Sequence, residues 1–136
     1  MKRTIVLILF ITQVFLSFSQ TKKLTDEDYN KSGAIKLKFV TSNVEVKDLA
    51  KSDIEKGLPF LLIQSGIGPV IYTTDRVFEN NYQVYYYEQG CVGLEIELMK
   101  VYNFEIFNNL TTRYGKKWIH SVRKDVIGLK QWKRRK

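Results

Sequence analysis

PFLLIQSGIGPVIYTTDRVFENNYQVYYYE, residues 59–88, is the stretch that decides the fold, because segments of strand length alternate in it with a turn and a short helical segment. The continuous apolar run at 59–64 predicts a central strand that is covered on both faces. A turn that contains Gly and Pro follows at 65–69 and leads into a further predicted strand at 70–75. The first half of the stretch therefore indicates a small sheet.

The second half of the stretch predicts a short helix and then a strand. The helix is expected at 75–82, and Thr74 or Asp75 can cap it. Val77 and Phe78 provide its buried side. A helix in this place would connect two strands of the same sheet.

The strand predicted at 83–88 carries three consecutive tyrosines. Alternation places Val84 and Tyr86 on one face. Tyr85 and Tyr87 lie on the other face, where rings at strand spacing could stack on sugars or bases. However, tyrosine is a favoured strand residue whose ring packs while its hydroxyl reaches solvent. We therefore predict a packed strand, with Tyr85 or Tyr87 as the exposed members that could bind a ligand.

The residues before this stretch predict one more strand and a helix. At 34–40 apolar residues alternate with lysines, a period-two pattern typical of a strand with one solvated face. At 44–57 apolar residues recur at helical steps, and Gly57 and Pro59 supply the cap and the break that end a helix.

The residues after the stretch predict two helices. From 94 to 114 apolar residues recur every three or four positions, and Gly115 caps the segment. A final helix, weakened at Gly128, is indicated by apolar residues at similar steps: Trp118, Val122, Val126 and Leu129.

The order of these elements predicts the fold class α+β, a single small domain with a sheet of about four strands covered by helices. A βαββαβ topology with two added C-terminal helices is consistent with this order. We expect the domain to span 34–130, preceded by a signal peptide at 1–19 and a polar, flexible leader at 20–33. Residues 131–136 would form a basic tail.

The first residues of the chain have the pattern of an export signal. Lys2 and Arg3 begin it, an apolar stretch follows at 5–16, and small residues precede a cleavage site before Gln20. An uncleaved anchor is the alternative, but the apolar run falls short of the ~20 residues that a spanning helix needs. We expect an exported protein, periplasmic or secreted, without a transmembrane span after cleavage.

The chain has one cysteine, Cys91, and one histidine, His120. A single cysteine cannot form an internal disulfide, so Cys91 is buried, paired between chains, or reactive. Its thiolate could act as a nucleophile with His120 as the base, which makes these two residues the weak catalytic candidates. Metal ligands are too few, and the turn at 65–69 lacks the Lys-Ser/Thr of a phosphate loop. We therefore expect no metal and no cofactor.

The basic residues gather at the C-terminus. Residues 113–136 hold ten basic residues and one acidic residue, Asp125, whereas residues 21–112 hold ten basic and thirteen acidic residues. Positive charge beside tryptophan suits an anionic surface, and each basic residue near such a membrane contributes about 1 kcal/mol. Alternatively, these charges only solvate a helix that packs on the core. The candidate binding residues here are Lys130, Trp132, Lys133, Arg134, Arg135 and Lys136.

Two separated stretches resemble one protein family. PFLLIQSGIGPVIYTTDRVFENNYQVYYYEQGC (59–91) and FNNLTTRYGKKWIHSVRKDVIGL (107–129) are similar, in order and motif, to the small exported bacterial FEKKY-domain proteins. The resemblance covers about residues 57–130. The name-giving segment here is Phe-Glu-Asn-Asn-Tyr at 78–82, with asparagines where the family has lysines. The resemblance implies the domain boundaries and export but no chemistry, because the family is a domain of unknown function.

These observations together predict a non-enzymatic interaction or envelope-associated module. Its basic C-terminus would contact an unknown protein partner or an anionic envelope surface, and nucleic acid is not expected for an exported protein. A Cys91-dependent thiol enzyme or redox sensor is the alternative, and a structural subunit of a larger assembly is a third interpretation.

Overall fold

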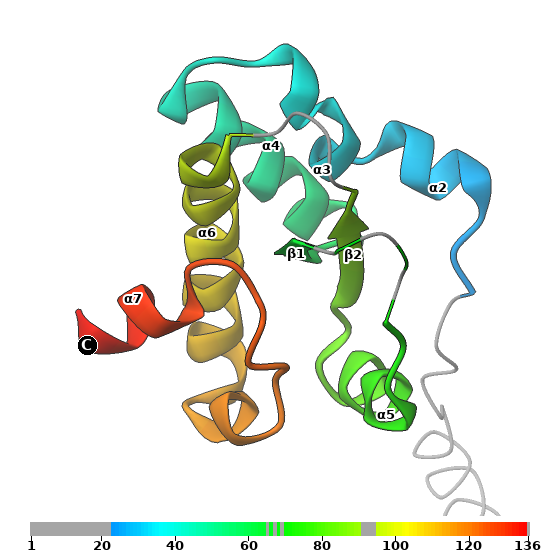
Figure 1. Ribbon diagram of the computed structural model, residues 1–136, viewed down its shortest axis with the longest axis vertical. Helices are drawn as coiled ribbons and strands as arrows, with labels where there is room; N and C mark the ends of the chain where they lie inside the picture. Colours follow the sequence, from blue (N-terminus) through cyan, green and yellow to red (C-terminus); the bar gives the residue numbers. More distant parts are fainter. Residues whose placement is uncertain (1–22, 65, 67, 69, 91–94, 136) are drawn as a thin grey trace, which may run out of the picture.

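The order of helices and strands follows from a computed structural model of the 136-residue chain, which describes residues 23–135 except 65, 67, 69 and 91–94 (Figure 1). The fold class α+β is confirmed. The elements are α2 (Asp26–Lys31), α3 (Gly33–Lys36), η2 (Leu37–Phe39), α4 (Asn43–Glu55), β1 (Phe60–Gln64), α5 (Thr73–Tyr82), β2 (Tyr85–Gln89), α6 (Ile96–Tyr114), η3 (Lys117–His120) and α7 (Leu129–Arg134).

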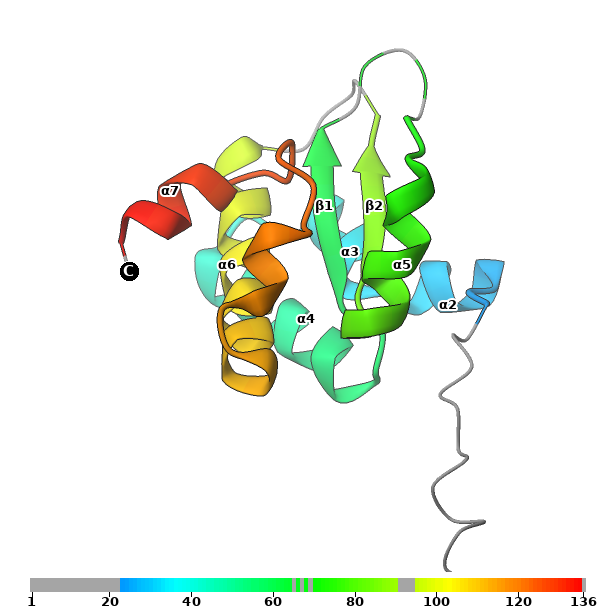
Figure 2. The same cartoon turned by 90° about the horizontal axis from the view of Figure 1, so that it is seen from below.

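The sheet is the centre of a βαβ unit. β1 and β2 are parallel, with Phe60 opposite Tyr85 and Gln64 opposite Gln89, and α5 lies between them in sequence. Figure 2 shows the two strands side by side, with α5 on one face and α3 and α4 behind. The strands expected at 59–64 and 83–88 and the helix at 75–82 are therefore confirmed. The prediction of about four strands is wrong for the described residues, which contain two.

The strand expected at 34–40 is instead the helical segment formed by α3 and η2. The buried carboxylate of Asp53 accepts the backbone N–H groups of Gly33 (2.7 Å) and Ala34 (3.1 Å), which satisfies donors that every helix start leaves free. Ala34 and Leu37, three residues apart, are buried, whereas Phe39 is 76% exposed. The pattern is too short to distinguish the period of a helix from the period of a strand, and the buried positions three residues apart show that it belongs to a helical segment.

The strand expected at 70–75 is also absent, because its second half is the first turn of α5. Asp75 accepts the backbone N–H of Tyr72 at 2.9 Å, a capping contact that fixes the start of the helix. The residues before it, Val70 and Ile71, are exposed and lie outside any strand. The β-branched residues suggested a strand, but the local cap determines the conformation.

A side chain from α6 satisfies backbone groups on the edge of β1 where a third strand would otherwise pair. Asn103 accepts the backbone N–H of Leu62 (2.9 Å) and donates to the carbonyl oxygens of Leu62 (3.0 Å) and Ile127 (2.8 Å). The backbone N–H of Ile127 also donates to Leu62 at 3.1 Å, and Val126 forms an antiparallel bridge with Ile63. The outer edge of β1 is thus paired without a third strand.

The long helices predicted at 44–57 and 94–114 are confirmed as α4 and α6. They pack on each other beside the sheet, and the hydroxyl of Tyr102 in α6 donates to Asp53 in α4 at 2.6 Å. Burial raises the pKa of the Asp53 carboxyl. The contact joins both long helices to the start of α3.

The final helix expected from Trp118 to Leu129 is wrong as a single element. The chain forms η3, then a turn, and begins α7 only at Leu129. All four residues of the apolar pattern are buried, so the pattern reported burial correctly. Gly128 is the residue before α7 and has φ +81°, a left-handed conformation that favours glycine.

Two terminal segments also differ from the expectation. Residues 26–31, placed in a flexible leader, form α2, because Thr25 and Asp28 make a reciprocal capping box. α7 includes residues 131–134, which were expected to belong to a basic tail. The signal peptide expected at 1–19 lies outside the described residues. Among the residues that are described, no helix is long and apolar enough to span a bilayer.

Candidate functional site

The tyrosines of β2 are packed rather than displayed. Tyr85 is only 6% exposed and Tyr87 is half-buried. The centres of their rings lie 5.9 and 6.0 Å from the centre of the Phe60 ring. Tyr29 of α2 adds a ring 6.2 Å from Tyr87. The prediction of a packed strand is confirmed, but Tyr85 is not an exposed member. No local pattern predicts that α2 covers this face, because Tyr29 lies more than fifty residues before the strand.

The two catalytic candidates are not brought together by the described structure. His120 is exposed at the end of η3, and Cys91 lies outside the described residues. Across the part of the chain that is described, no cluster of three or more His, Cys, Asp or Glu side chains could hold a metal ion. The described residues therefore offer no support for thiol or metal chemistry.

A buried arginine joins the two sequence stretches that carry the strongest motifs. Arg123 donates to Asp125 through Nε (3.0 Å) and Nη2 (2.6 Å), and through Nη1 to Asp75 (3.2 Å) and Glu88 (3.5 Å). The Arg123 side chain is 7% exposed. We call these four residues the Arg123 cluster. Sequence reasoning missed it, because its members come from α5, β2 and the segment before α7.

The Arg123 cluster holds the segment that precedes α5. Arg123 Nη1 donates to the carbonyl oxygen of Val70 at 2.8 Å, and Glu88 accepts the Val70 N–H at 3.1 Å. The guanidinium also lies 4.8 Å from the ring centre of Tyr72. The hydrogen bonds and charge of Arg123 hold the pKa of the Asp125 carboxyl below its usual range. Since the guanidinium of Arg123 is 7% exposed and is occupied by acceptors of the protein itself, this cluster stabilises the fold rather than presenting a free positive charge.

α7 is arranged in the opposite way, with its aromatic residue inside and its charges outside. Trp132 is 4% exposed, packs with tilted rings against Phe107 and Trp118 (ring centres 5.5 Å from each) and donates to Asn108 Oδ1 at 3.1 Å. Trp132 was expected among the binding residues, but the structure places it in the core. Its role here is to anchor α7.

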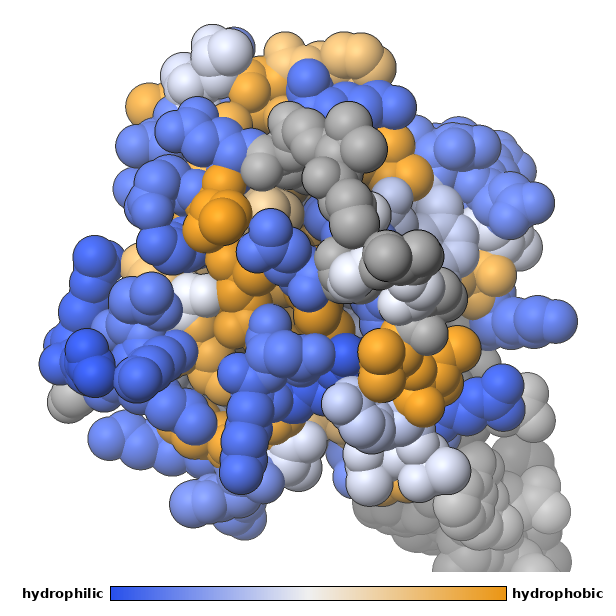
Figure 3. Space-filling model, in the orientation of Figure 1, coloured by the Kyte–Doolittle hydropathy of each residue, from blue (hydrophilic) through white to orange (hydrophobic). Residues whose placement is uncertain are grey.

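The remaining predicted residues of this helix point away from the core. We call the exposed side chains Lys130, Lys133, Arg134 and Arg135 the basic face of α7. Residues 126–136 contain no acidic residue that could neutralise them locally. Figure 3 shows hydrophilic residues gathered over α7. Lys136, the last predicted binding residue, lies outside the described residues.

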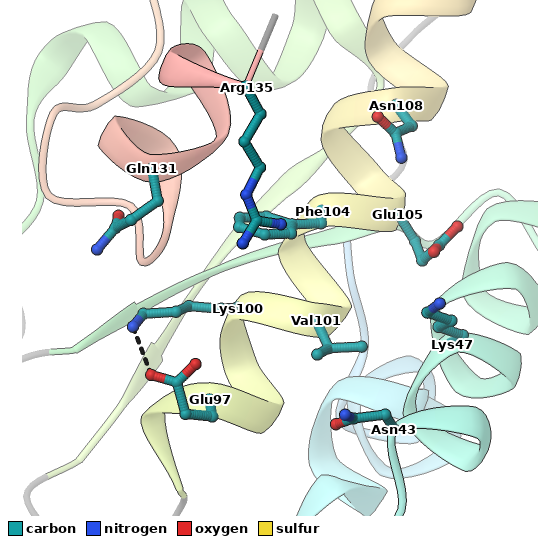
Figure 4. A pocket seen from close by; sticks show the side chains of 10 residues that line it. All are labelled: Asn43, Lys47, Glu97, Lys100, Val101, Phe104, Glu105, Asn108, Gln131 and Arg135. Atoms are coloured by element: carbon teal, nitrogen blue, oxygen red, sulfur yellow. Dashed lines mark hydrogen bonds and ion pairs between the residues drawn. The ribbon is translucent and has the colours of Figure 1, made fainter.

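A groove of about 420 Å³ lies beside the basic face, between α4, α6 and α7. Lys47 and Asn43 come from α4, whereas Arg135 and Gln131 come from the C-terminal end of the chain. The α6 side chains between them are Glu97, Lys100, Val101, Phe104, Glu105 and Asn108. Figure 4 shows these residues around the groove, with Arg135 over Phe104.

The charged residues of the groove differ in whether they are already paired with an opposite charge. Lys100 pairs with Glu97 at 2.6 Å, whereas the Arg135 guanidinium lies 4.9 Å from the ring centre of Phe104. Gly128 allows α7 to lie this close to α6, because a Cβ there would come within 2.9 Å of Phe104 and 3.1 Å of Lys100. The arrangement can bind an anionic group at the α7 end and apolar atoms along α6.

Comparison with known proteins assigns no role to this site. No family model matches the chain, and neither a curated protein nor a solved structure is significantly similar to it. Sequence reasoning found the basic residues of α7 but missed Lys47, Lys100 and Phe104. No local pattern relates those three to α7, because only the packing of α4 on α6 brings them to the groove.

Proposed function

We propose that this protein is an exported, non-enzymatic interaction module that binds an anionic partner through the basic face of α7. The observation that carries the proposal is the orientation of α7. Trp132 fixes the helix on the core, so Lys130, Lys133 and Arg134 project outward from a defined position. Charges that are already positioned lose less conformational entropy on binding than charges on a flexible tail.

The proposed contact is electrostatic. Since Trp132 is buried, the helix offers no aromatic side chain for insertion into a bilayer, and attraction depends on charge alone. Exposed charges are screened over about 8 Å at physiological ionic strength, so binding should weaken as salt is added. The partner must carry a high local density of negative charge.

Export and family membership belong to the same proposal. The pattern at 1–19 supports export to the periplasm or beyond the cell. The similarity of 57–130 to FEKKY-domain proteins stays a prediction. If it holds, the basic face of α7 would be a feature to test in that family as well.

The test measures binding of the whole chain to polyglutamate and to vesicles of phosphatidylglycerol, with phosphatidylcholine vesicles as the neutral reference. The variant combines Lys130→Gln, Lys133→Gln and Arg134→Gln, which removes charge but leaves Trp132 in place. A matched control combines Lys36→Gln, Lys38→Gln and Lys51→Gln, which removes the same charge from exposed positions elsewhere.

We expect the wild type and the control to bind at least one anionic probe in a salt-sensitive manner. The α7 variant should bind about tenfold more weakly or worse, because each exposed basic residue contributes up to ~1 kcal/mol. Equal loss in both triple variants would show that net charge, not α7, is responsible. Absence of binding to every anionic probe would overturn the proposed function.

A further inference from the structure

We propose that the groove between α4, α6 and α7 recognises a carboxylate side chain together with a neighbouring apolar side chain, both from an acidic segment of a protein partner. This inference rests on the proposed function, because the basic face of α7 would attract the same segment. It adds a specific recognition element to a general electrostatic attraction.

Arg135 is the group that would receive the carboxylate. Its guanidinium lies against the ring of Phe104, 4.9 Å from the ring centre, while the residue itself remains exposed. An arginine that stacks on an aromatic face keeps its N–H groups at the edge of the guanidinium plane, where they can bind a carboxylate through two parallel hydrogen bonds. The stacking also restricts the side chain, so less entropy is lost on binding.

The balance of charge in the groove places the carboxylate at the α7 end. Glu97 is already paired with Lys100, so it contributes little net charge. The unpaired acidic side chain of the lining, Glu105, lies toward α4 and Lys47, away from Gln131 and the end of α7 (Figure 4). Lys47 offsets the charge of Glu105 on the α4 side, so a carboxylate would be attracted most strongly near Arg135.

The floor of the groove explains why an apolar neighbour is required. Val101 and Phe104 are partly exposed apolar side chains on the same face of α6, and both line the groove. Its volume of about 420 Å³ accommodates one or two side chains but not a folded domain. Burying an apolar side chain there would contribute about 25 cal/mol for each Å² removed from water.

A protein segment fits this site better than a membrane surface does. The apolar floor is recessed between three helices, and a flat layer of lipid headgroups cannot follow it. With Trp132 in the core, the described residues of α7 present no exposed aromatic side chain to a bilayer. An extended acidic segment, by contrast, can place one side chain on Val101 and the side chain two residues along, which lies on the same face, on Arg135.

The test compares three labelled peptides of equal length: one that repeats Glu-Ser-Leu-Ser, so that Glu and Leu share one face of the extended chain, one that replaces each Glu by Gln, and one that replaces each Leu by Ser. Binding of each to the whole chain is measured by fluorescence anisotropy at low salt. The variants are Arg135→Met, which keeps an apolar stem near Phe104, and Arg135→Lys, which keeps the charge but loses the planar fork. Arg134→Met is the comparison within the basic face of α7, since Arg134 is the adjacent exposed arginine outside the groove. Arg113→Met is the matched control, because Arg113 is an exposed arginine that also lies on an aromatic ring, that of Tyr114, but does not line the groove.

We expect the Glu/Leu peptide to bind most tightly, and Arg135→Met to weaken it about tenfold, with Arg135→Lys intermediate. Arg134→Met should weaken binding by less than about threefold, as expected for a charge at the edge of the contact, and Arg113→Met should leave binding unchanged. If Arg134→Met and Arg135→Met weaken binding equally and the peptide without Leu binds as well as the Glu/Leu peptide, the groove inference fails while the proposed function stands. If no acidic peptide binds but phosphatidylglycerol vesicles do, the partner is a membrane and the inference fails. If no anionic probe binds, both fail.

Discussion

Arg123 and Arg135 are the same residue type in opposite surroundings. The side chain of Arg123 is 7% exposed and meets three carboxylates, whereas Arg135 is exposed and lies on the ring of Phe104. One guanidinium joins α5, β2 and the segment before α7, and the other lines a groove. The formal charge of +8 therefore overstates the positive charge on the surface, because Arg123 is paired with carboxylates of the protein itself.

The two regions also differ in how they are anchored. The Arg123 cluster is held by hydrogen bonds between charged groups, while the basic face of α7 is held by the packing of Trp132. Replacing Arg123 should therefore affect stability, and replacing the exposed basic residues should affect binding. The predictions below test this separation, beginning with the largest effect.

Trp132→Ala should destabilise the protein by about 4 kcal/mol, because it removes a large buried aromatic side chain and leaves a cavity beside Phe107 and Trp118. Urea denaturation followed by circular dichroism measures the change. Lys133→Ala, the neighbouring exposed position, should change the free energy of unfolding by less than about 0.5 kcal/mol. Similar values for both variants would mean that α7 is not anchored as described.

Arg123→Met should lower the free energy of unfolding by about 3 kcal/mol, because it leaves the buried carboxylates of Asp75 and Glu88 without their cation. Chemical denaturation measures this, and limited proteolysis should detect faster cleavage near Val70, whose carbonyl oxygen loses its donor. Arg134→Met is the control and should be nearly neutral. If Arg123→Met proves as mild as this control, the contrast between the two arginine sites is unfounded.

Gly128→Ala should cost about 2 kcal/mol, since an added Cβ would combine a left-handed backbone with a contact 2.9 Å from Phe104. Gly57→Ala is the matched control. It has a similar φ of +69° but nothing within 4 Å of the added atom, so backbone strain of about 1 kcal/mol should be its whole effect. The difference between the melting temperatures of the two variants measures the close approach of α7 to α6. Equal melting temperatures would show that α7 does not need glycine at position 128 in order to pack closely on α6.

Asp125→Asn should have the smallest effect, below about 1 kcal/mol at neutral pH, because this partner of Arg123 is half-exposed. The pKa of Asp125 is lowered by its hydrogen bonds to Arg123, so the folded state favours the charged form. Its contribution is therefore present above the ordinary value of about 4 and is lost as the pH falls through the lower, folded value. Denaturation across this pH range should show the wild type and the variant converge in acid. A constant difference at every pH would contradict the ion pair.

The sequence predicted the elements that have long or strongly apolar patterns. α4 and α6 have the expected type because their helical period extends over 13 and 19 residues, whereas β1 and β2 were indicated by a continuous apolar run and by consecutive tyrosines. The segments at 34–40 and 70–75 failed because short alternation competes with local capping. Asp53 and Asp75, which provide those capping contacts, are buried polar residues whose partners cannot be identified from neighbouring letters.

Of the candidate site, only the concentration of basic residues could be predicted from the sequence. The concentration of basic residues after 113 identified the charged region that contains α7, but Gly128 was interpreted as a weakness within a longer helix and not as the residue before a new one. The inward orientation of Trp132 could not be predicted, because its partners Phe107 and Asn108 lie more than twenty residues earlier. The groove requires α4 to pack on α6, which is a tertiary contact.

The amide side chain of Asn103 has a consequence for association between copies of the chain. An open strand edge is a template on which other molecules can add strands and grow into fibres. Here Asn103 and Ile127 occupy the outer edge of β1, and Glu79 accepts the N–H of Tyr86 on β2 at 3.0 Å. A two-stranded sheet therefore stays finite, and replacing Asn103 would be expected to promote polymerisation before it altered any binding surface.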